Sequence, residues 1–262
     1  LEIVNENLET FTTTLYKKIN LNKNNCFENE LIKLVNEDLN IEDLDGIFIT
    51  HEHIDHIRGL KNKKKNYNVP IYSKTATLKQ IAITQKFTDI NLKNCQALTT
   101  NNIDIGNLAI KIFNISHDAI DPVGYTISKY KDNAKTKKFT EKITLATDLG
   151  FVSETVQSAL ENSDILVLEA NHDLKLLQNG QYPWSLKKRI LSTKGHLSNI
   201  DAGFAINRLQ AKPQQIILAH LSEQNNSPDI ALNTIKQIFQ ENNLTDISLH
   251  VASPDRMLNI KN

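Results

Sequence analysis

The chain has 262 residues, with 40% hydrophobic and 23% charged side chains, which is enough to bury one sizeable core. Its 8 Gly and 6 Pro exclude collagen-like and low-complexity architectures, and no apolar run approaches the roughly 18 residues of a membrane-spanning helix. The 30 basic and 30 acidic side chains cancel, so a site for a polyanion has to be local. We expect one cytoplasmic domain over residues 1–262, with Cys26 and Cys95 as ordinary thiols.

Taken in chain order, short β-branched segments predict strands, and amphipathic segments between or after them predict helices. The strands are expected at residues 46–50, 108–113, 142–146, 164–168 and 215–219, with a strand-like run at 247–251. Helices are expected over about 76–87, from Asn199 to Leu209, and after Ser227, which is a suitable N-cap with Pro228 in the first turn. The last helix has the apolar stripe Ala231, Ile235, Ile238 and Phe239. Strands and helices alternate in the second half, which favours sheets covered by helices.

The most informative segment is His51-Glu52-His53-Ile54-Asp55-His56, directly after the strand predicted to end at Thr50. In an extended turn, His51 and His53 point to the same side and can share one metal ion. Asp55 and His56 lie where the chain would enter a helix and can reach a second ion. Imidazole nitrogen and carboxylate oxygen suit borderline divalent ions such as zinc. The alternative is a polar surface loop that is rich in histidine.

Three further donors follow predicted strands in the same manner. His117 comes after the segment 110–115, Asp148 after 144–147 and His220 after 216–219. Strand ends at one edge of a sheet converge, so these side chains are expected to meet the His51–His56 segment and complete a site for two ions. Taken alone, His117 or His220 would more often be a hydrogen-bonded structural histidine.

The pattern His51-x-His53-x-Asp55-His56 resembles the signature of the metallo-β-lactamase fold superfamily, and later segments resemble its WalJ/YycJ (VicX) type of hydrolase. Those segments are Ser116–Ala119, Asp121–Tyr125, Ala146–Gly150, Leu168–Asp173, Arg189–Ser192, Gly195–Asn199 and Leu218–Asn226. The resemblance runs from about residue 40 to the C-terminus. Residues 1–40 lack the Gly/Ser-rich stretch and the Asp-Cys-Gly-like turn with which relatives usually begin, so this segment is atypical or truncated.

The resemblance implies an α/β fold, an αββα sandwich of two mixed β-sheets flanked by helices, with a dinuclear metal site along one edge. It assigns His51, His53 and His117 to the first ion, Asp55, His56 and His220 to the second, and Asp148 to both. Zn²⁺ suits the nitrogen-rich ligands, with Mn²⁺ as the alternative. Two such ions, roughly 3.5–4 Å apart, lower the pKa of a bridging water, whose hydroxide attacks phosphorus or a carbonyl carbon. Asp55 and Asp148 are also candidates to handle protons.

Candidate substrate residues follow the later strands. Glu169, Asn171, His172 and Asp173 come after the strand at 164–168, where some are expected to fix the tautomer of a ligating histidine and others to cap a helix. His196, with Ser198 and Asn199, opens a predicted helix whose N-terminus can bind phosphate. There His196 would contact phosphate or protonate a leaving group. The alternative is that Ser198 or Asn199 is simply the N-cap.

The segment Tyr182–Arg189 combines two aromatic residues with three cations, including Lys188 and Arg189. This composition is typical of a surface that stacks bases and contacts phosphates. A solvated helix face with Trp184 in the core explains it nearly as well. His250, inside the run 247–251, is expected to be structural.

We therefore expect a metal-dependent phosphodiester hydrolase with a nucleic-acid substrate, DNA being favoured over RNA. The resemblance further implies a DNA exonuclease of 5′-to-3′ polarity. The alternatives are an RNA-processing or small-ester, thioester or lactam hydrolase on the same fold, and a non-catalytic metal-binding regulatory protein. Oxidoreductase members of the superfamily typically carry Glu where His53 stands, which argues against a di-iron redox role. The sequence does not assign an oligomeric state.

Overall fold

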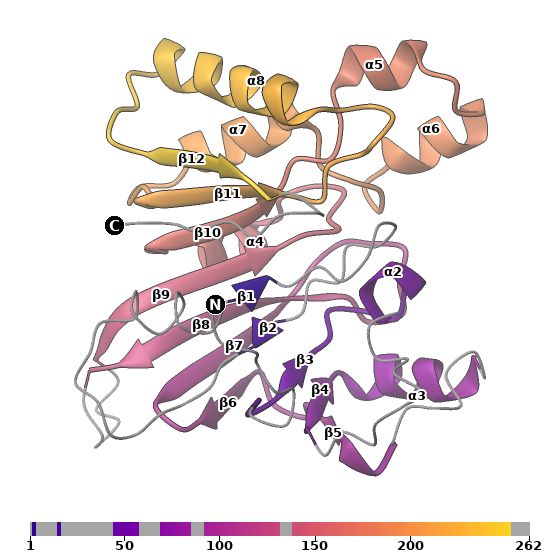
Figure 1. Ribbon diagram of the computed structural model, residues 1–262, viewed down its shortest axis with the longest axis vertical. Helices are drawn as coiled ribbons and strands as arrows, with labels where there is room; N and C mark the ends of the chain where they lie inside the picture. Colours follow the sequence, from indigo (N-terminus) through magenta and orange to yellow (C-terminus); the bar gives the residue numbers. More distant parts are fainter. Residues whose placement is uncertain are drawn as a thin grey trace. The chain divides into compact units, whose positions relative to one another are not determined.

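The computed structural model describes residues 2–3, 15–16, 44–57, 69–84, 92–131 and 138–252, and Figure 1 shows the course of the chain. The chain forms two compact units. Unit 1 comprises Leu1–Thr100, Ala119–Asp121 and Ser253–Asn262, and unit 2 comprises Asn101–Asp118 and Pro122–Ala252. Most of the atypical segment 1–40, including Cys26, lies outside the described residues. The expectation of one domain over 1–262 stays a prediction.

Unit 2 is built on a seven-stranded mixed sheet with the order β12-β11-β10-β9-β8-β7-β6 (Figure 1). The strands are β6 (Asn102–Ile105), β7 (Leu108–Asn114), β8 (Val123–Tyr130), β9 (Phe139–Ala146), β10 (Ile165–Glu169), β11 (Gln215–Ala219) and β12 (Ser248–Val251). From β9 to β12 all neighbours are parallel, whereas β6 to β9 are antiparallel. The carboxyl ends of β9, β10 and β11 therefore lie at one edge, where parallel sheets commonly place their functional side chains.

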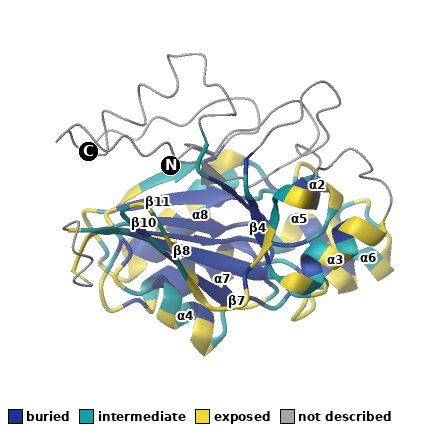
Figure 2. Ribbon diagram, turned by 90° about the horizontal axis from the view of Figure 1, so that it is seen from below, coloured by how far each residue is buried: buried dark blue, intermediate teal, exposed yellow. Residues whose placement is uncertain are grey.

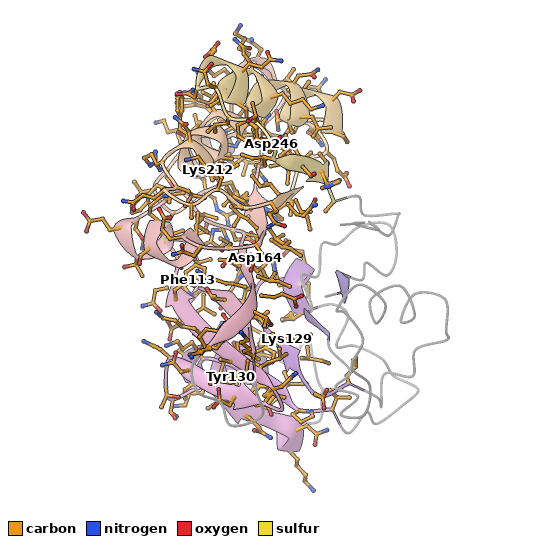
Figure 3. All side chains as sticks on the ribbon, turned by 90° about the vertical axis from the view of Figure 1, so that its left-hand side faces the viewer. Phe113, Lys129, Tyr130, Asp164, Lys212 and Asp246 are labelled. Atoms are coloured by element: carbon orange, nitrogen blue, oxygen red, sulfur yellow. The ribbon has the colours of Figure 1, made fainter. Side chains whose placement is uncertain are left out.

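The strands predicted at 108–113, 142–146, 164–168, 215–219 and 247–251 are confirmed within a few residues at each end. Strand β8 was not predicted. Every residue from Val123 to Ser128 is buried, although Val123, Tyr125 and Ile127 alternate with small or polar residues in the sequence, a pattern that could have predicted this strand. At Gly124 the chain approaches β7 so closely that an added Cβ would collide with the ring of Phe113, a residue labelled in Figure 3.

Five helices accompany this sheet in the described part of unit 2: α4 (Glu154–Leu160), α5 (Leu174–Asn179), α6 (Trp184–Ile190), α7 (Asn199–Asn207) and α8 (Pro228–Glu241). The predicted α7 and α8 are confirmed, and Ser227 caps α8 by accepting a hydrogen bond from the amide of Ile230 at 3.2 Å. Helices α7 and α8 pack Ile206, Ile235 and Phe239 against Leu168 and Leu218 of the sheet. In Figure 2 the strands β8, β10 and β11 are largely buried, while α4 and α6 carry exposed residues.

Unit 1 contains a smaller sheet of order β1-β2-β3-β4-β5. Its elements are β1 (Glu2–Ile3), β2 (Leu15–Tyr16), β3 (Ile47–Phe48), α2 (Ile54–Ile57), β4 (Ile71–Ser73), α3 (Thr75–Ile83), a short 3-10 helix at Leu92–Asn94 and β5 (Cys95–Ala97). The strand predicted at 46–50 is the short β3, parallel to β4. The predicted helix over 76–87 is α3, which begins one residue earlier and ends at Ile83.

A buried cluster of isoleucines holds unit 1 together around β3. Ile47, Ile49, Ile57, Ile71 and Ile81 form it with Val69. Ile49 and Ile57 flank the His51–His56 segment, so the packing of these two side chains fixes both ends of that segment. No helix within the described ranges is both long and apolar enough to cross a membrane.

Candidate metal centre

Asp148 and His220, two predicted ligands in unit 2, share an unusual backbone conformation. Asp148 follows β9 and His220 follows β11, and their φ angles are 59° and 57°. Left-handed backbone at residues other than glycine is strained by on the order of 1–3 kcal/mol and clusters at functional sites. The two side chains approach one another, with Nε2 of His220 3.4 Å from Oδ1 of Asp148. The two strand ends thus bring a carboxylate and an imidazole together.

The carboxylate of Glu169, the last residue of β10, lies behind these groups and is fully buried. Its Oε1 is 2.8 Å from Nδ1 of His196 and 2.7 Å from Nδ1 of His220. Its Oε2 accepts hydrogen bonds from the amides of Leu149 and Leu197, each at 3.0 Å. One carboxylate therefore fixes two imidazole rings and the two chain segments that follow Asp148 and His196.

These contacts keep Glu169 ionised. Burial by itself raises its pKa, but the charge of His196 and the hydrogen bonds from His196 and His220 outweigh burial and lower the pKa to about 2. An ionised carboxylate only accepts hydrogen bonds, so each Nδ1 that faces Glu169 carries a hydrogen. In the neutral ring the lone pair is then on Nε2, which is the form that binds a metal ion.

His117 is held by a different acceptor to the same effect. Its Nδ1 is 3.2 Å from the carbonyl oxygen of Gly195, and its Nε2 is 3.8 Å from Oδ1 of Asp148. Burial lowers the pKa of His117, although Asp148 acts in the opposite direction, which favours the neutral ring. Gly195 is required here because an added Cβ would collide with the carbonyl oxygen of Ile190.

The donor atoms of unit 2 are close enough for a metal ion. One atom from each of Asp148, Glu169, His196 and His220 lies within 4.8 Å of the others. We call these four residues the strand-end cluster. The ring centroids of His117 and His220 each lie 5.1 Å from that of His196. Imidazole nitrogens with a carboxylate oxygen form a donor set that fits borderline divalent ions.

In unit 1 the three histidines of the His51–His56 segment also lie together. The ring centroid of His51 is 4.6 Å from that of His53 and 4.0 Å from that of His56. The hydroxyl oxygen of Thr50 lies 3.1 Å from Nδ1 of His51 and 3.4 Å from Nδ1 of His56. Asp55 Oδ2 is 3.5 Å from His56 Nε2. The segment thus gathers three imidazoles and a carboxylate.

Two of the predicted substrate residues make internal side-chain hydrogen bonds, and the side chain of a third is buried without one among the described residues. Ser198 caps α7, since its hydroxyl accepts a hydrogen bond from the amide of Asp201 at 3.1 Å. The buried Asn199 exchanges side-chain hydrogen bonds with Asn226 at 3.0 and 2.8 Å. His172 is 1% exposed, and neither ring nitrogen has a hydrogen-bond partner among the described residues. The contacts of Ser198 favour the capping alternative.

The other two predicted substrate residues lie on α6, after a buried lysine. Lys187 donates hydrogen bonds to the carbonyl oxygens of Gln178 and Gly180 at 2.8 and 2.7 Å. Arg189 donates to Asp118, next to His117. Lys188 is exposed and lies near the ring of Trp184. The alternative that places Trp184 in the core is wrong, because Trp184 is 61% exposed.

Comparison with known proteins identifies the family. The model of the β-lactamase superfamily domain matches residues 28–221, which is more than half of the chain. The chain belongs to the β-lactamase superfamily. Exodeoxyribonuclease YycJ of Bacillus anthracis is 34% identical to it over 212 residues, which cover 78% of this chain and 74% of that protein. Exodeoxyribonuclease WalJ of Streptococcus pneumoniae serotype 2 is 35% identical over 219 residues, covering 82% and 78%.

Solved structures support the same fold at low sequence identity. The metallo-β-lactamase fold protein YhfI of Bacillus subtilis aligns with a TM-score of 0.58 and 19% identity, covering 87% of this chain and 81% of that one. Zn²⁺-bound PqqB of Methylobacterium extorquens gives 0.58 and 13%, covering 81% and 72%. The predictions of a WalJ/YycJ-type member, of an α/β fold with mixed sheets and helices, and of a metal-dependent hydrolase are confirmed. Together with the donor clusters, the family indicates divalent-metal binding.

Two features of the centre were incompletely predicted. The position of Glu169 at a strand end indicated a role in fixing a tautomer, but not that it serves both His196 and His220. The contacts of Thr50 with His51 and His56 were not predicted. Thr50 directly precedes the histidine segment, and this position is the feature of the sequence that could have indicated a contact with the histidines. The predicted structural role of His250 agrees with its 2.9 Å contact to Oε1 of Gln215.

Proposed function

We propose that the chain is a DNA exonuclease of 5′-to-3′ polarity that depends on two divalent ions. The observation that carries the proposal is the strand-end cluster, in which Glu169 fixes Nδ1 of both His196 and His220 beside Asp148. The identity of 34–35% to two curated proteins named exodeoxyribonuclease supports DNA as the substrate.

The proposed ligands are those that the family resemblance assigns. His51, His53 and His117 would hold one ion, Asp55, His56 and His220 the other, and Asp148 both. The donor set of five imidazoles and two aspartates supports Zn²⁺, with Mn²⁺ as the alternative. Two bound ions would lower the pKa of a water molecule toward neutrality, making hydroxide available as nucleophile, and would neutralise charge on the phosphodiester.

The chain's own residues would orient groups and move protons. His196, with Nδ1 on Glu169, presents Nε2 to a leaving group. As the bond from phosphorus to the leaving oxygen breaks and the bond from phosphorus to the water oxygen forms, protonated His196 would give its proton to the leaving oxygen. Asp55 and Asp148 are proposed to handle the proton of the water.

A substrate panel tests the proposal. Duplex DNA labelled at either the 5′ or the 3′ end, RNA of the same sequence and a chromogenic ester are incubated with the metal-loaded chain. Release of labelled mononucleotide from the 5′ end of DNA, abolished by a chelator, is the expected result. Cleavage of RNA or ester alone would favour the other hydrolase alternatives, and metal binding without any cleavage would favour the regulatory protein.

Asp148→Asn with Asp246→Asn as control makes the test specific to the site. Both aspartates have left-handed backbone, with φ of 59° and 61°. Asp246, however, is exposed and lies in the loop between α8 and β12. Loss of activity in Asp148→Asn alone supports the metal-centre assignment.

We also propose a cytoplasmic location, which the free thiol of Cys95 supports and which a fluorescent fusion would test.

A further inference from the structure

Helix α6 presents the single tryptophan of the chain to solvent. Trp184 is the first residue of α6 and is 61% exposed. Scattered exposed apolar residues are ordinary in soluble proteins, so exposure alone does not define a site. An indole is, however, the largest π face available to a protein, and its exposure here coincides with a local group of cations on the same helix.

The three cations of α6 differ in their contacts: two are bonded to other described parts of the chain, and one is not. The ammonium of Lys187 is buried on the carbonyl oxygens of Gln178 and Gly180. The guanidinium of Arg189 is bonded to Asp118. Within the described part of the chain, Lys188 has no carboxylate partner, and its Nζ lies 5.7 Å from the ring centroid of Trp184. Lys188 is therefore the cation of α6 that is available to a ligand.

Trp184 and Lys188 are four residues apart on one helix face, and the distance is within the range of a weak cation–π contact. This contact restrains the indole beside an ammonium while much of the ring stays exposed. A flat π surface next to a single positive charge matches one nucleotide unit, which has a flat base next to a single negative phosphate.

Helix α6 is also fixed to the strand-end cluster. The amide of His196 donates a hydrogen bond to the carbonyl oxygen of Ile190, the last residue of α6, at 3.0 Å. A helix of seven residues is about 10 Å long. The indole therefore lies roughly one helix length from the segment that carries His196, and Figure 1 shows α6 on the side toward which β9, β10 and β11 point.

We propose that Trp184 and Lys188 form a stacking platform for an unpaired nucleotide of single-stranded DNA, with the base against the indole and the phosphate at the ammonium. The proposal rests on the proposed function for the choice of DNA. Bases inside a duplex are already stacked on their neighbours, so the platform favours a single-stranded end over paired DNA.

The fluorescence of Trp184 tests the proposal directly, since no other tryptophan contributes. The metal-loaded full chain is titrated with a phosphorothioate oligothymidylate of about 12 nucleotides, a length within the usual site size for single strands. We expect saturable quenching by the single strand and much weaker quenching by a blunt duplex of equal length. Absence of quenching, or equal quenching by the duplex, would overturn the platform.

Variants then separate stacking from charge. By anisotropy of a labelled oligothymidylate, Trp184→Ala is expected to weaken binding about tenfold or more, Trp184→Phe to retain part of it, and Lys188→Gln to weaken it severalfold with a smaller salt dependence. Phe139→Ala, which removes another exposed aromatic side chain from unit 2, is the matched control and should bind like the parent. Unchanged binding in Trp184→Ala, with the fold intact by circular dichroism, would contradict the proposal.

The two proposals fail in different ways. If the chain binds single strands through Trp184 but releases no nucleotide from any DNA, the exonuclease proposal fails and the platform stands. If DNA is degraded normally by Trp184→Ala with unchanged affinity for a single-stranded end, the platform fails and the exonuclease proposal stands.

Discussion

Oε1 of Glu169 lies 2.8 Å from Nδ1 of His196 and 2.7 Å from Nδ1 of His220, so two rings carried by different loops share one anchor. Since residues that orient metal-bound histidines typically affect metal affinity by 10- to 100-fold, this carboxylate is expected to matter for activity although it does not face the substrate.

Replacing Glu169 by Gln should lower metal affinity by about 10- to 100-fold and reduce kcat by at least a similar factor. The neutral amide cannot accept hydrogen bonds on both terminal atoms, and each oxygen of Glu169 accepts from two donors, so two of the four donors lose their acceptor. Titration with Zn²⁺ and steady-state kinetics on labelled DNA measure the two effects. Glu154→Gln, on the exposed first turn of α4, should change neither; wild-type metal affinity in Glu169→Gln would contradict the anchoring role.

The metal-free chain should lose stability as the pH falls below about 6.5. Burial lowers the pKa of His172 from 6.5 to about 4, so the unfolded chain binds more protons than the folded one between these values, and acid favours unfolding. Glu169, whose pKa is lowered from 4.5 to about 2, extends the same trend to lower pH.

Urea unfolding at several pH values measures this trend. For His172 the linked free energy is on the order of 3 kcal/mol, and His172→Gln should remove most of the slope between pH 6.5 and 4. A variant that keeps the wild-type slope in that interval would show that His172 is not the group responsible.

Ser198→Ala distinguishes a helix cap from a phosphate ligand. The hydroxyl of Ser198 accepts a hydrogen bond from the amide of Asp201, so its loss should cost about 1 kcal/mol of unfolding free energy and leave the affinity for single-stranded DNA unchanged. Ser198→Thr, which keeps the hydroxyl, serves as the control. A loss of DNA affinity with unchanged stability would instead support the phosphate role.

Gly195→Ala should be strongly destabilising. The added methyl group would collide with the backbone of Ile190 and displace the carbonyl oxygen that faces Nδ1 of His117. We expect a loss of about 2 kcal/mol or more, with weaker metal binding in whatever folds. Lys194→Ala, at the exposed neighbouring position, should be nearly neutral in thermal unfolding; equal melting temperatures for the two variants would contradict the close-contact argument.

The sequence by itself determined the features that are local. The His51–His56 segment is read from six consecutive residues, and the positions of Asp148, Glu169 and His220 follow from β-branched strands at whose carboxyl ends they lie. The same holds for α8, whose cap and apolar stripe lie within its own residues. Each of these signals depends on the period of one element, so no distant contact is needed to recognise it.

Tertiary structure decided what depends on partners far along the chain. Strand β8 alternates apolar with small or polar residues in the sequence, yet Val123–Ser128 are all buried, which depends on the elements packed around the strand. Three consecutive cations look equivalent in the sequence, yet Lys187 is buried on two carbonyls, Arg189 is bonded to Asp118 and Lys188 lies beside Trp184. Glu169 serves His196 and His220 because parallel strands bring residues 27 and 51 positions away to the same carboxylate. Burial and pairing are properties of the folded neighbourhood, which a pattern of residue types does not contain.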